Sequence, residues 1–285
     1  MQNVFAFAPA QHRINWKNVA IITTFHLAAL PVFWTFSWQN VAALLIGNWI
    51  VGSLGVGLGW HRLLTHQSFK TSKWIEYTLS ILATMSIQDS PNKWIATHRI
   101  HHAFTDTDKD PHSIRPGFWW AQIGWIVWGT AQDHDQKTLR RYIPDLLKDR
   151  GHALISRFYV VPIIISAAIL FAIGGWSMVI WGVFARVVFG WHTTWFVNSL
   201  SHIYGSRPHE TGDESTNNWF VALLTFGEGW HNNHHMYPTS ARHGLGWYQF
   251  DMNWIAIRVL EYVGWARNVR LPNIDPNQIE LKRAA

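Results

Sequence analysis

The sequence predicts an all-α integral membrane protein, with four transmembrane helices and a cytoplasmic helical cap that holds a histidine-rich site for two metal ions. Three observations predict this fold class. Two long segments are almost free of charge, tryptophan accounts for 20 of the 285 residues, and many of the 17 histidines gather in short clusters. Amphipathic indole rings are typical of the two surfaces of a bilayer.

The uncharged segments predict the membrane spans. No Asp, Glu, Lys or Arg occurs between residues 19 and 60, and only Arg186 occurs between residues 158 and 206. Because one span needs about 20 mostly apolar residues, each segment is long enough for two spans joined by a tight turn. We expect turns at 37–40 and 174–176, and spans at about 19–36, 41–59, 159–173 and 177–200.

The remaining residues form the predicted cap, at 61–157 and 201–285. Of the 23 Lys and Arg residues, all but Arg186 lie in the N-terminal arm or in these two segments. Four spans place all three segments on one side, and the positive-inside tendency makes that side cytoplasmic, with both termini. No linker or repeat divides the chain, so residues 1–285 are predicted to form a single domain. We also expect no cleavable signal peptide.

Shorter elements are expected within the cap. Residues 74–87 have helical apolar spacing, which predicts either an amphipathic helix on the membrane surface or a short buried helix. Pro91 interrupts this pattern, and a new segment is expected from Lys93. Residues 118–130 are uncharged but too short to span, so we expect them in the interface. A short, partly inserted helix is expected at 219–226.

The composition excludes several classes of site. The chain has no cysteine, so it contains no disulfide, thiolate ligand or iron-sulfur cluster, and any metal must be bound by nitrogen and oxygen. The net charge of +6 comes from basic residues scattered among 17 acidic ones. This distribution does not form the basic strip expected of a nucleic-acid-binding protein, so no nucleic-acid partner is predicted.

Nine histidines have the spacing of metal ligands. Residues three and four apart on a helix share a face, so the two His-x-x-His-His clusters can each direct their rings to one place. In the four-span topology, all of these histidines lie on the cytoplasmic side. Nine imidazoles exceed the shell of one ion, which predicts two metal ions. The predicted ligands are His61, His66, His98, His101, His102, His202, His231, His234 and His235.

These clusters and their surroundings resemble the membrane fatty-acid desaturase family. The chain is most similar to the acyl-CoA desaturase-like Δ9 branch, which includes the cyanobacterial acyl-lipid enzymes, from about residue 15 to 272. Four stretches beyond the histidines carry the resemblance: Gln-Asp-Ser-Pro at 88–91, Asp-Thr-Asp-Lys-Asp-Pro-His at 106–112, Asn-Ser-Leu-Ser-His at 198–202 and Gly-Glu-Gly-Trp at 227–230.

The resemblance implies two Fe²⁺ ions, with His202 as a ligand and Asn198 bound through water. It also implies an O2-dependent reaction that leaves a cis double bond in a long acyl chain, in a bacterial inner or thylakoid-type membrane. The chain contains no haem domain or nucleotide motif, so electrons must come from an external carrier, with ferredoxin as the first expectation. Whether the acyl chain is linked to lipid, coenzyme A or a carrier protein stays open.

Other polar residues are interpreted as side chains that orient the metal ligands, as side chains that pack between helices, or as surface residues. Asp106, Asp108 and Glu228 are candidates to orient ligand imidazoles, whereas Asp110 is expected in a solvated loop. Arg186 is interpreted as a structural pairing residue within its span. His26 and His192 are expected to pack between helices. Surface or loop positions are expected for His12, His112, His134, His152, His209 and His243.

Two alternative functions are kept. A hydroxylase, epoxidase or acetylenase would use a similar site on a similar chain, and product analysis discriminates it from a desaturase. A divalent-metal transporter belongs to another class and would place polar ligands near the middle of the bilayer. The predicted spans contain no Asp or Glu, which disfavours a transporter.

Overall fold

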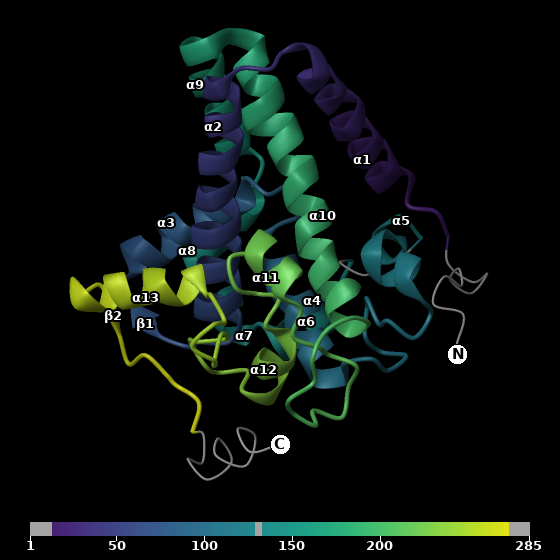
Figure 1. The fold of residues 1–285 in the computed structure, drawn as a ribbon, viewed down its shortest axis with the longest axis vertical. Coiled ribbons are helices and arrows are strands. Elements are labelled where there is room, and N and C mark those ends of the chain that lie inside the picture. Colours follow the sequence, from purple (N-terminus) through teal and green to yellow (C-terminus); the bar gives the residue numbers. More distant parts are fainter. Residues whose placement is uncertain (1–12, 129–132, 274–285) are drawn as a thin grey trace.

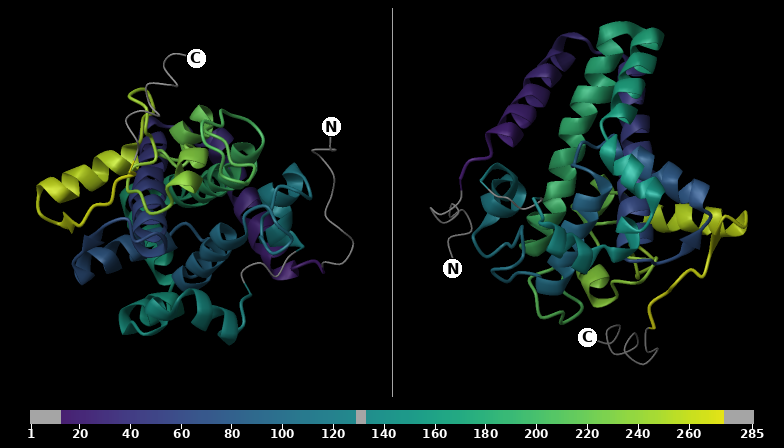
Figure 2. Two further views of the ribbon diagram at one scale, coloured as in Figure 1. Left: turned by 90° about the horizontal axis from the view of Figure 1, so that it is seen from below. Right: turned by 180° about the vertical axis from the view of Figure 1, so that it is seen from behind.

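The computed structural model describes residues 13–128 and 133–273. Long apolar helices project from one side of a cap that is built from short helices and loops (Figure 1). The two further views show the same division, with helix α13 extending sideways from the cap (Figure 2). The predicted helical fold class is confirmed at this level.

The first helical hairpin contains α1 (Trp16–Ala29), a 3-10 turn (Leu30–Trp34) and α2 (Trp38–Asn48), which continues as a π-helical segment (Trp49–Thr65). The side chain of Ser37 accepts a hydrogen bond from the backbone N–H of Asn40 and caps α2. The helix therefore begins inside the connector predicted at 37–40. It also continues beyond the predicted end at residue 59 and includes His61.

The second hairpin contains α9 (Val161–Val179), a π-helical segment (Ile180–Ala185), α10 (Arg186–Asn198) and a 3-10 turn (Leu200–His202). The chain reverses within α9 at Gly174 and Gly175, where the backbone is not helical. Gly175 has a φ of 65°, a conformation that glycine adopts without a steric penalty. The turn predicted at 174–176 is confirmed.

Within residues 13–128 and 133–273, two helical stretches are long and apolar enough to cross a membrane, Trp38–Thr65 and Val161–His202. The second contains the reversal at Gly175, so it forms two antiparallel arms. Tryptophan side chains are exposed at the far ends of the arms, with Trp34, Trp38 and Trp176 at 80%, 75% and 68% exposure. This exposure matches the aromatic belt that membrane proteins place at the bilayer surface.

The cap is assembled from the segments between and after the hairpins. It contains a π-helical segment at Trp120–Gly124 and a two-stranded antiparallel sheet that pairs Lys70 with Arg267 and Thr71 with Ala266. Its helices and strands are β1 (Lys70–Thr71), α3 (Lys73–Thr84), α4 (Pro91–Phe104), α5 (Trp125–Val127), α6 (Gln136–Tyr142), α7 (Pro144–Leu147), α8 (Arg150–Arg157), α11 (Trp219–Leu224), α12 (His231–Met236), α13 (Met252–Tyr262) and β2 (Ala266–Arg267).

Helix α3 packs closely against the π-helical segment that follows α2. A Cβ atom at Gly55 would lie 2.6 Å from the backbone nitrogen of Ala83, so only glycine permits this approach. The buried side chains of Ile75 and Leu79 continue the contact, whereas Trp74 on the other face is 57% exposed. The predicted helix is confirmed, and one of its faces is buried.

Other short elements follow the predictions with shifted ends. Helix α4 begins at Pro91, two residues before the predicted start, because proline suits the first turn of a helix. Helix α11 ends at Leu224, within the helix predicted at 219–226. The uncharged stretch predicted at 118–130 contains α5, and Trp120 and Trp125 are buried there. Its last two residues lie outside the described part of the chain.

Buried polar groups tie the arms together. Arg186 donates from Nε to the carbonyl of Gly182 at 2.9 Å and from Nη2 to the carbonyl of Met85 at 2.8 Å, so the cation caps the C-terminus of α3. These bonds support the interpretation of Arg186 as a pairing residue. His26 and His192 join α1 to α10 through their Nε2 atoms, which lie 3.1 Å apart.

Candidate metal centre

The nine histidines predicted as ligands lie in two neighbouring groups. Within each group the nearest ring nitrogens all lie within 4.8 Å of one another. We call His61, His66, His98, His102 and His234 the first histidine group. We call His101, His202, His231 and His235 the second histidine group.

Helical spacing divides the two His-x-x-His-His clusters between the groups. On α4, His98 and His102 are one turn apart and face the first group, while His101 faces the second. On α12 the order is exchanged, because His231 and His235 face the second group and His234 faces the first. The two short helices therefore lie between the groups and supply both.

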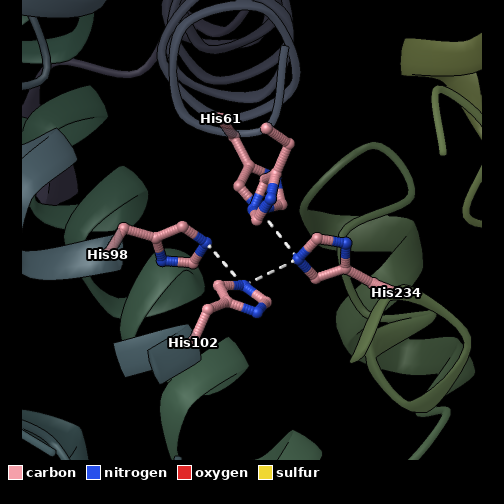
Figure 3. A group of neighbouring side chains, drawn as sticks. His61, His98, His102 and His234 are labelled. Atoms are coloured by element: carbon pink, nitrogen blue, oxygen red, sulfur yellow. Dashed lines mark hydrogen bonds between the residues drawn. The ribbon is translucent and has the colours of Figure 1, made fainter. Parts of the chain in front are cut away.

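The rings of the first group point toward a common centre from three elements (Figure 3). The Nε2 atom of His234 lies 3.1 Å from that of His61 and 3.0 Å from that of His102. The Nε2 atoms of His102 and His98 are 3.2 Å apart. Burial and the neighbouring imidazoles hold the pKa of His98, His102 and His234 well below the ordinary value, so these rings stay neutral, as metal ligands must be.

The second group has the same convergence. The Nε2 atoms of His231 and His202 are 3.1 Å apart, and those of His101 and His235 are 3.4 Å apart. His101 donates from Nδ1 to Asp110 at 2.9 Å, and His235 donates from Nδ1 to Asp213 at 2.8 Å. His202 donates in the same way to Asp106 at 3.0 Å.

These hydrogen bonds show that the rings fit a metal. A neutral imidazole carries one ring proton, and a carboxylate only accepts, so the proton of His101 and that of His235 must both be on Nδ1. Their Nε2 atoms then face each other at 3.4 Å with bare lone pairs and no proton between them. A cation between the two nitrogens would remove this repulsion, which is the donor arrangement that a divalent transition metal requires.

The carboxylates behind the imidazoles of the second group are ionised, and Asp106 and Asp110 are buried whereas Asp213 is half-buried. Burial alone would raise the pKa of Asp106, but hydrogen bonds from His202 and from two backbone N–H groups lower it to about 2. Against the same effect of burial, the electrostatic contact and hydrogen bond with His101 lower the pKa of Asp110. The hydrogen bond and electrostatic contact with His235 likewise lower the pKa of Asp213.

Glu228 supports the first group and belongs to a buried ionic network. Its Oε2 accepts from His61 Nδ1 at 2.7 Å, and its Oε1 accepts from Arg62 Nε at 3.1 Å. Arg62 is fully buried and forms a two-pronged ion pair with Asp251, at 2.9 and 3.1 Å. Against the effect of burial, the charge of Arg62 and the electrostatic contact with His61 hold the pKa of Glu228 well below its ordinary value.

These contacts partly correct the prediction of which carboxylates orient the ligand imidazoles. Asp106 and Glu228 lie behind ligand histidines as expected, whereas Asp108 is exposed and makes no hydrogen bond to a histidine in the described part of the chain. Asp110, expected in a solvated loop, takes the supporting position instead. Asp213 was not among the candidates, because it lies 22 residues before its partner in an irregular segment.

Three histidines expected at the surface are buried. His243 is 1% exposed, and its Nδ1 lies 3.0 Å from Glu228. His112 is 4% exposed, with its ring centroid 4.4 Å from that of His101. His152 is fully buried and forms a hydrogen bond with Glu76, and neither residue belongs to the two histidine groups. Their sequence spacing carries no signal, because each contact joins separate elements. His134 and His209 are only half-buried, and His12 lies outside the described residues.

Two cavities meet beside the histidine groups. The outer cavity begins at α1 with Lys17 and Asn18, and the inner cavity runs between α2 and α10 as far as Asn48 and Arg186. Both cavities share five lining residues, which we call the junction: Gln88, Trp94, His98, Thr194 and Asn198. Asn198, the predicted water-mediated ligand, therefore lies between the cavities and beside a histidine of the first group.

Known proteins share this sequence over most of its length. The fatty acid desaturase family matches residues 36–269. The chain is 44% identical to sn-1 stearoyl-lipid 9-desaturase of Anabaena variabilis over 91% of its own length and 95% of the relative's. It is 41% identical to sn-2 palmitoyl-lipid 9-desaturase of Nostoc sp. (strain 36), over 94% and 95%.

A plant relative has a different named substrate. The chain is 41% identical to acyl-CoA 5-desaturase AL21 of Anemone leveillei, over 90% of this chain and 79% of that protein. The family match covers well over half of the chain and includes all nine histidines of the two groups. The protein is a member of the fatty acid desaturase family.

Proposed function

We propose that the protein is an O2-dependent desaturase that introduces a cis double bond, at Δ9, into a long saturated acyl chain. Two iron ions in the two histidine groups and an external electron donor complete the reaction. One observation carries the proposal: two cavities meet at a junction that includes His98 of the first histidine group, so a chain passing between the cavities would lie beside His98 and Asn198. The named activities of the cyanobacterial relatives support the Δ9 position.

The two cavities suit the two ends of an acyl substrate. The surface that the inner cavity exposes is mainly apolar, with Val51, Val56 and Val187 among its lining residues, which suits the methyl end of the chain. Trp94 donates to the side-chain oxygen of Gln88 at 3.0 Å, and Gln88 donates to Thr194 at 3.1 Å. These bonds fix the wall of the junction and would hold one segment of the chain in place.

The reaction consumes the acyl chain, O2, two electrons and two protons, and yields an alkene and two water molecules. When bound, the iron pair supplies the oxidising power for removing hydrogen from an unactivated methylene. The chain's own residues hold the ligand rings, orient the substrate at the junction and exclude bulk water through the buried walls of the inner cavity. A ferredoxin is the proposed electron carrier.

The charges around the outer cavity favour an acyl group esterified to a membrane lipid. Among the described residues that line this cavity, Lys17 and Asp89 are the only Lys, Arg, Asp or Glu residues. Coenzyme A carries several phosphate charges, which this nearly neutral lining does not match. The lipid-linked substrates named for the cyanobacterial relatives agree with this choice.

The membrane arrangement is also proposed. Four spans, formed by α1, α2, α9 and α10, would place the cap and both histidine groups on the cytoplasmic side. Because the chain has no cysteine, single cysteines report topology directly. In intact cells, a membrane-impermeant maleimide should label Trp176→Cys at the far turn. It should label Lys148→Cys in the cap only after lysis, and the reverse pattern would contradict the orientation.

The activity test is expression beside ferredoxin and its reductase in a bacterium without O2-dependent desaturases. Total acyl chains are analysed by mass spectrometry after the double bonds have been derivatised. A new alkene at carbon 9 is expected from the wild type and from His209→Gln, which changes a histidine outside both groups. His101→Ala should give none, because it removes a ligand. Hydroxylated or alkyne products would replace the proposed reaction with one of the alternatives.

A further inference from the structure

Carboxylates are distributed unevenly behind the two histidine groups. In the second group, three of the four ligand histidines donate from Nδ1 to a carboxylate. In the first group, only His61 does so among the described residues. The Nδ1 atom of His234 in the first group is buried without a hydrogen-bond partner in the same part of the chain. The three carboxylates of the second group are Asp106, Asp110 and Asp213.

The charges of these carboxylates are also compensated unequally. Glu228, behind the first group, pairs with the guanidinium of Arg62 at 3.1 Å and accepts from Asn253 at 2.6 Å. Over residues 13–128 and 133–273, the side chains of Asp106, Asp110 and Asp213 form no ion pair with lysine or arginine. In the described part of the chain, the second group therefore has three carboxylates that pair with no lysine or arginine, although Arg207 donates to the backbone carbonyl of Asp213, and the first has one carboxylate that pairs with an arginine.

Burial keeps this difference strong. Asp106 is 2% exposed and Asp110 is 5% exposed, so little water or salt screens their charges. An imidazole that binds a metal is neutral, so the fifth imidazole of the first group would add no charge. The supporting carboxylates are thus the main source of unequal charge at the two positions. A carboxylate that accepts a hydrogen bond from a ligand imidazole also makes that imidazole a stronger electron-pair donor to the metal.

We propose that Asp106, Asp110 and Asp213 make the two metal positions unequal, so that the second histidine group favours the more oxidised ion. When the reduced iron pair loses one electron to an electrode, that electron should leave the iron of the second group. The iron of the first group would stay reduced, and no proton or bond needs to move. The inference rests on the proposed function, because only a redox-active pair can show this order.

The test uses purified full-length protein loaded with ⁵⁷Fe and poised anaerobically at a series of potentials. Mössbauer spectra at the one-electron level should show equal amounts of Fe²⁺ and Fe³⁺, each localised at its own position. Asp213→Asn should raise the potential of the first oxidation step, because it removes one negative charge while keeping a side-chain oxygen that can accept from His235. The preference of the second histidine group for the oxidised ion should fall about tenfold. For one electron this corresponds to a potential shift of about 59 mV.

Two variants separate charge from structure. Asp213→Glu retains the charge and should return the first step toward the wild-type potential. Asp149→Asn removes a carboxylate that bonds to Lys73 and Tyr77 instead of a histidine group, and it should leave both steps unchanged. Equal shifts of both steps in Asp213→Asn, or a pair oxidised without localised valences, would overturn the inference. Protein that binds fewer than two irons would instead contradict the proposed function.

Discussion

Gln88 donates a hydrogen bond from Nε2 to Oγ1 of Thr194 at 3.1 Å, across the junction of the outer and inner cavities. The contact joins the segment before α4 to α10, which are 106 residues apart in sequence. Because both residues line both cavities, this bond fixes the wall that an acyl chain would follow past the histidine groups.

Thr194→Val should therefore reduce regiochemical precision. The substitution nearly preserves the side-chain volume but removes the hydroxyl that accepts from Gln88. We expect lower total desaturation and double bonds spread over neighbouring carbons, measured by mass spectrometry of derivatised acyl chains. Thr78→Val is the matched control, because Thr78 bonds only to the carbonyl of Trp74 on the exposed face of α3. A single product position in Thr194→Val would show that the bond does not set the register.

The depth of the inner cavity should limit the length of the acyl chain. Gly190 lines this cavity, and a Cβ there would meet only the side-chain oxygen of Asn48, at 3.6 Å. Gly190→Val fills open space without a backbone clash, so product should shift toward shorter acyl chains in a mixture of lengths. Ala185→Val adds bulk outside both cavities and should leave the length distribution unchanged. An unaltered distribution in Gly190→Val would place the methyl end elsewhere.

The buried Arg62–Asp251 pair should be essential for stability. Arg62→Met leaves Asp251 and Glu228 buried without their cation, which is expected to cost about 3–5 kcal/mol of unfolding free energy. Arg258→Ala breaks a pair with Glu261 on an exposed face of α13 and should cost less than about 1 kcal/mol. Chemical unfolding in detergent measures both. Similar losses for the two variants would mean that the buried network contributes little.

The His26–His192 contact should couple α1 to α10. His26 also bonds through Nδ1 to the carbonyl of Ile22 at 2.8 Å, so its Nε2 accepts the proton of His192. Replacing each histidine singly and then both by leucine forms a double-mutant cycle. The expected coupling is about 0.6 kcal/mol, with roughly 1.7 kcal/mol as an upper limit for hydrogen bonds between membrane helices. Additive losses would show that the two rings are only neighbours.

The sequence predicted the features that depend on local pattern. The two uncharged segments located both hairpins and the turn at Gly175. Hydrophobicity and the backbone freedom of glycine can both be read from a few neighbouring residues. Ligand spacing located the nine histidines, since i, i+3 and i, i+4 positions share a helix face. The same spacing did not show that His101 and His102, although adjacent, belong to different groups.

Features that depend on distant contacts were missed. Asp213, His243 and Arg62 have no local pattern that distinguishes them from ordinary polar residues. Each acquires its position through partners far along the chain, such as the Arg62–Asp251 bonds across 189 residues. The helical state of residues 61–65 was also missed, because this π-helical segment packs closely against α3, a contact that the local sequence does not reveal.

The first histidine group draws on residues from 61 to 234, which lie on three separate segments of the chain. During synthesis, His61, His66, His98 and His102 are made long before His234, so the first group lacks one of its histidines until α12 has been made. Both metal positions would therefore be complete only when α12 has folded beside α4. Metal binding would then be a late step of folding, and chains that end before α12 would lack a complete iron site.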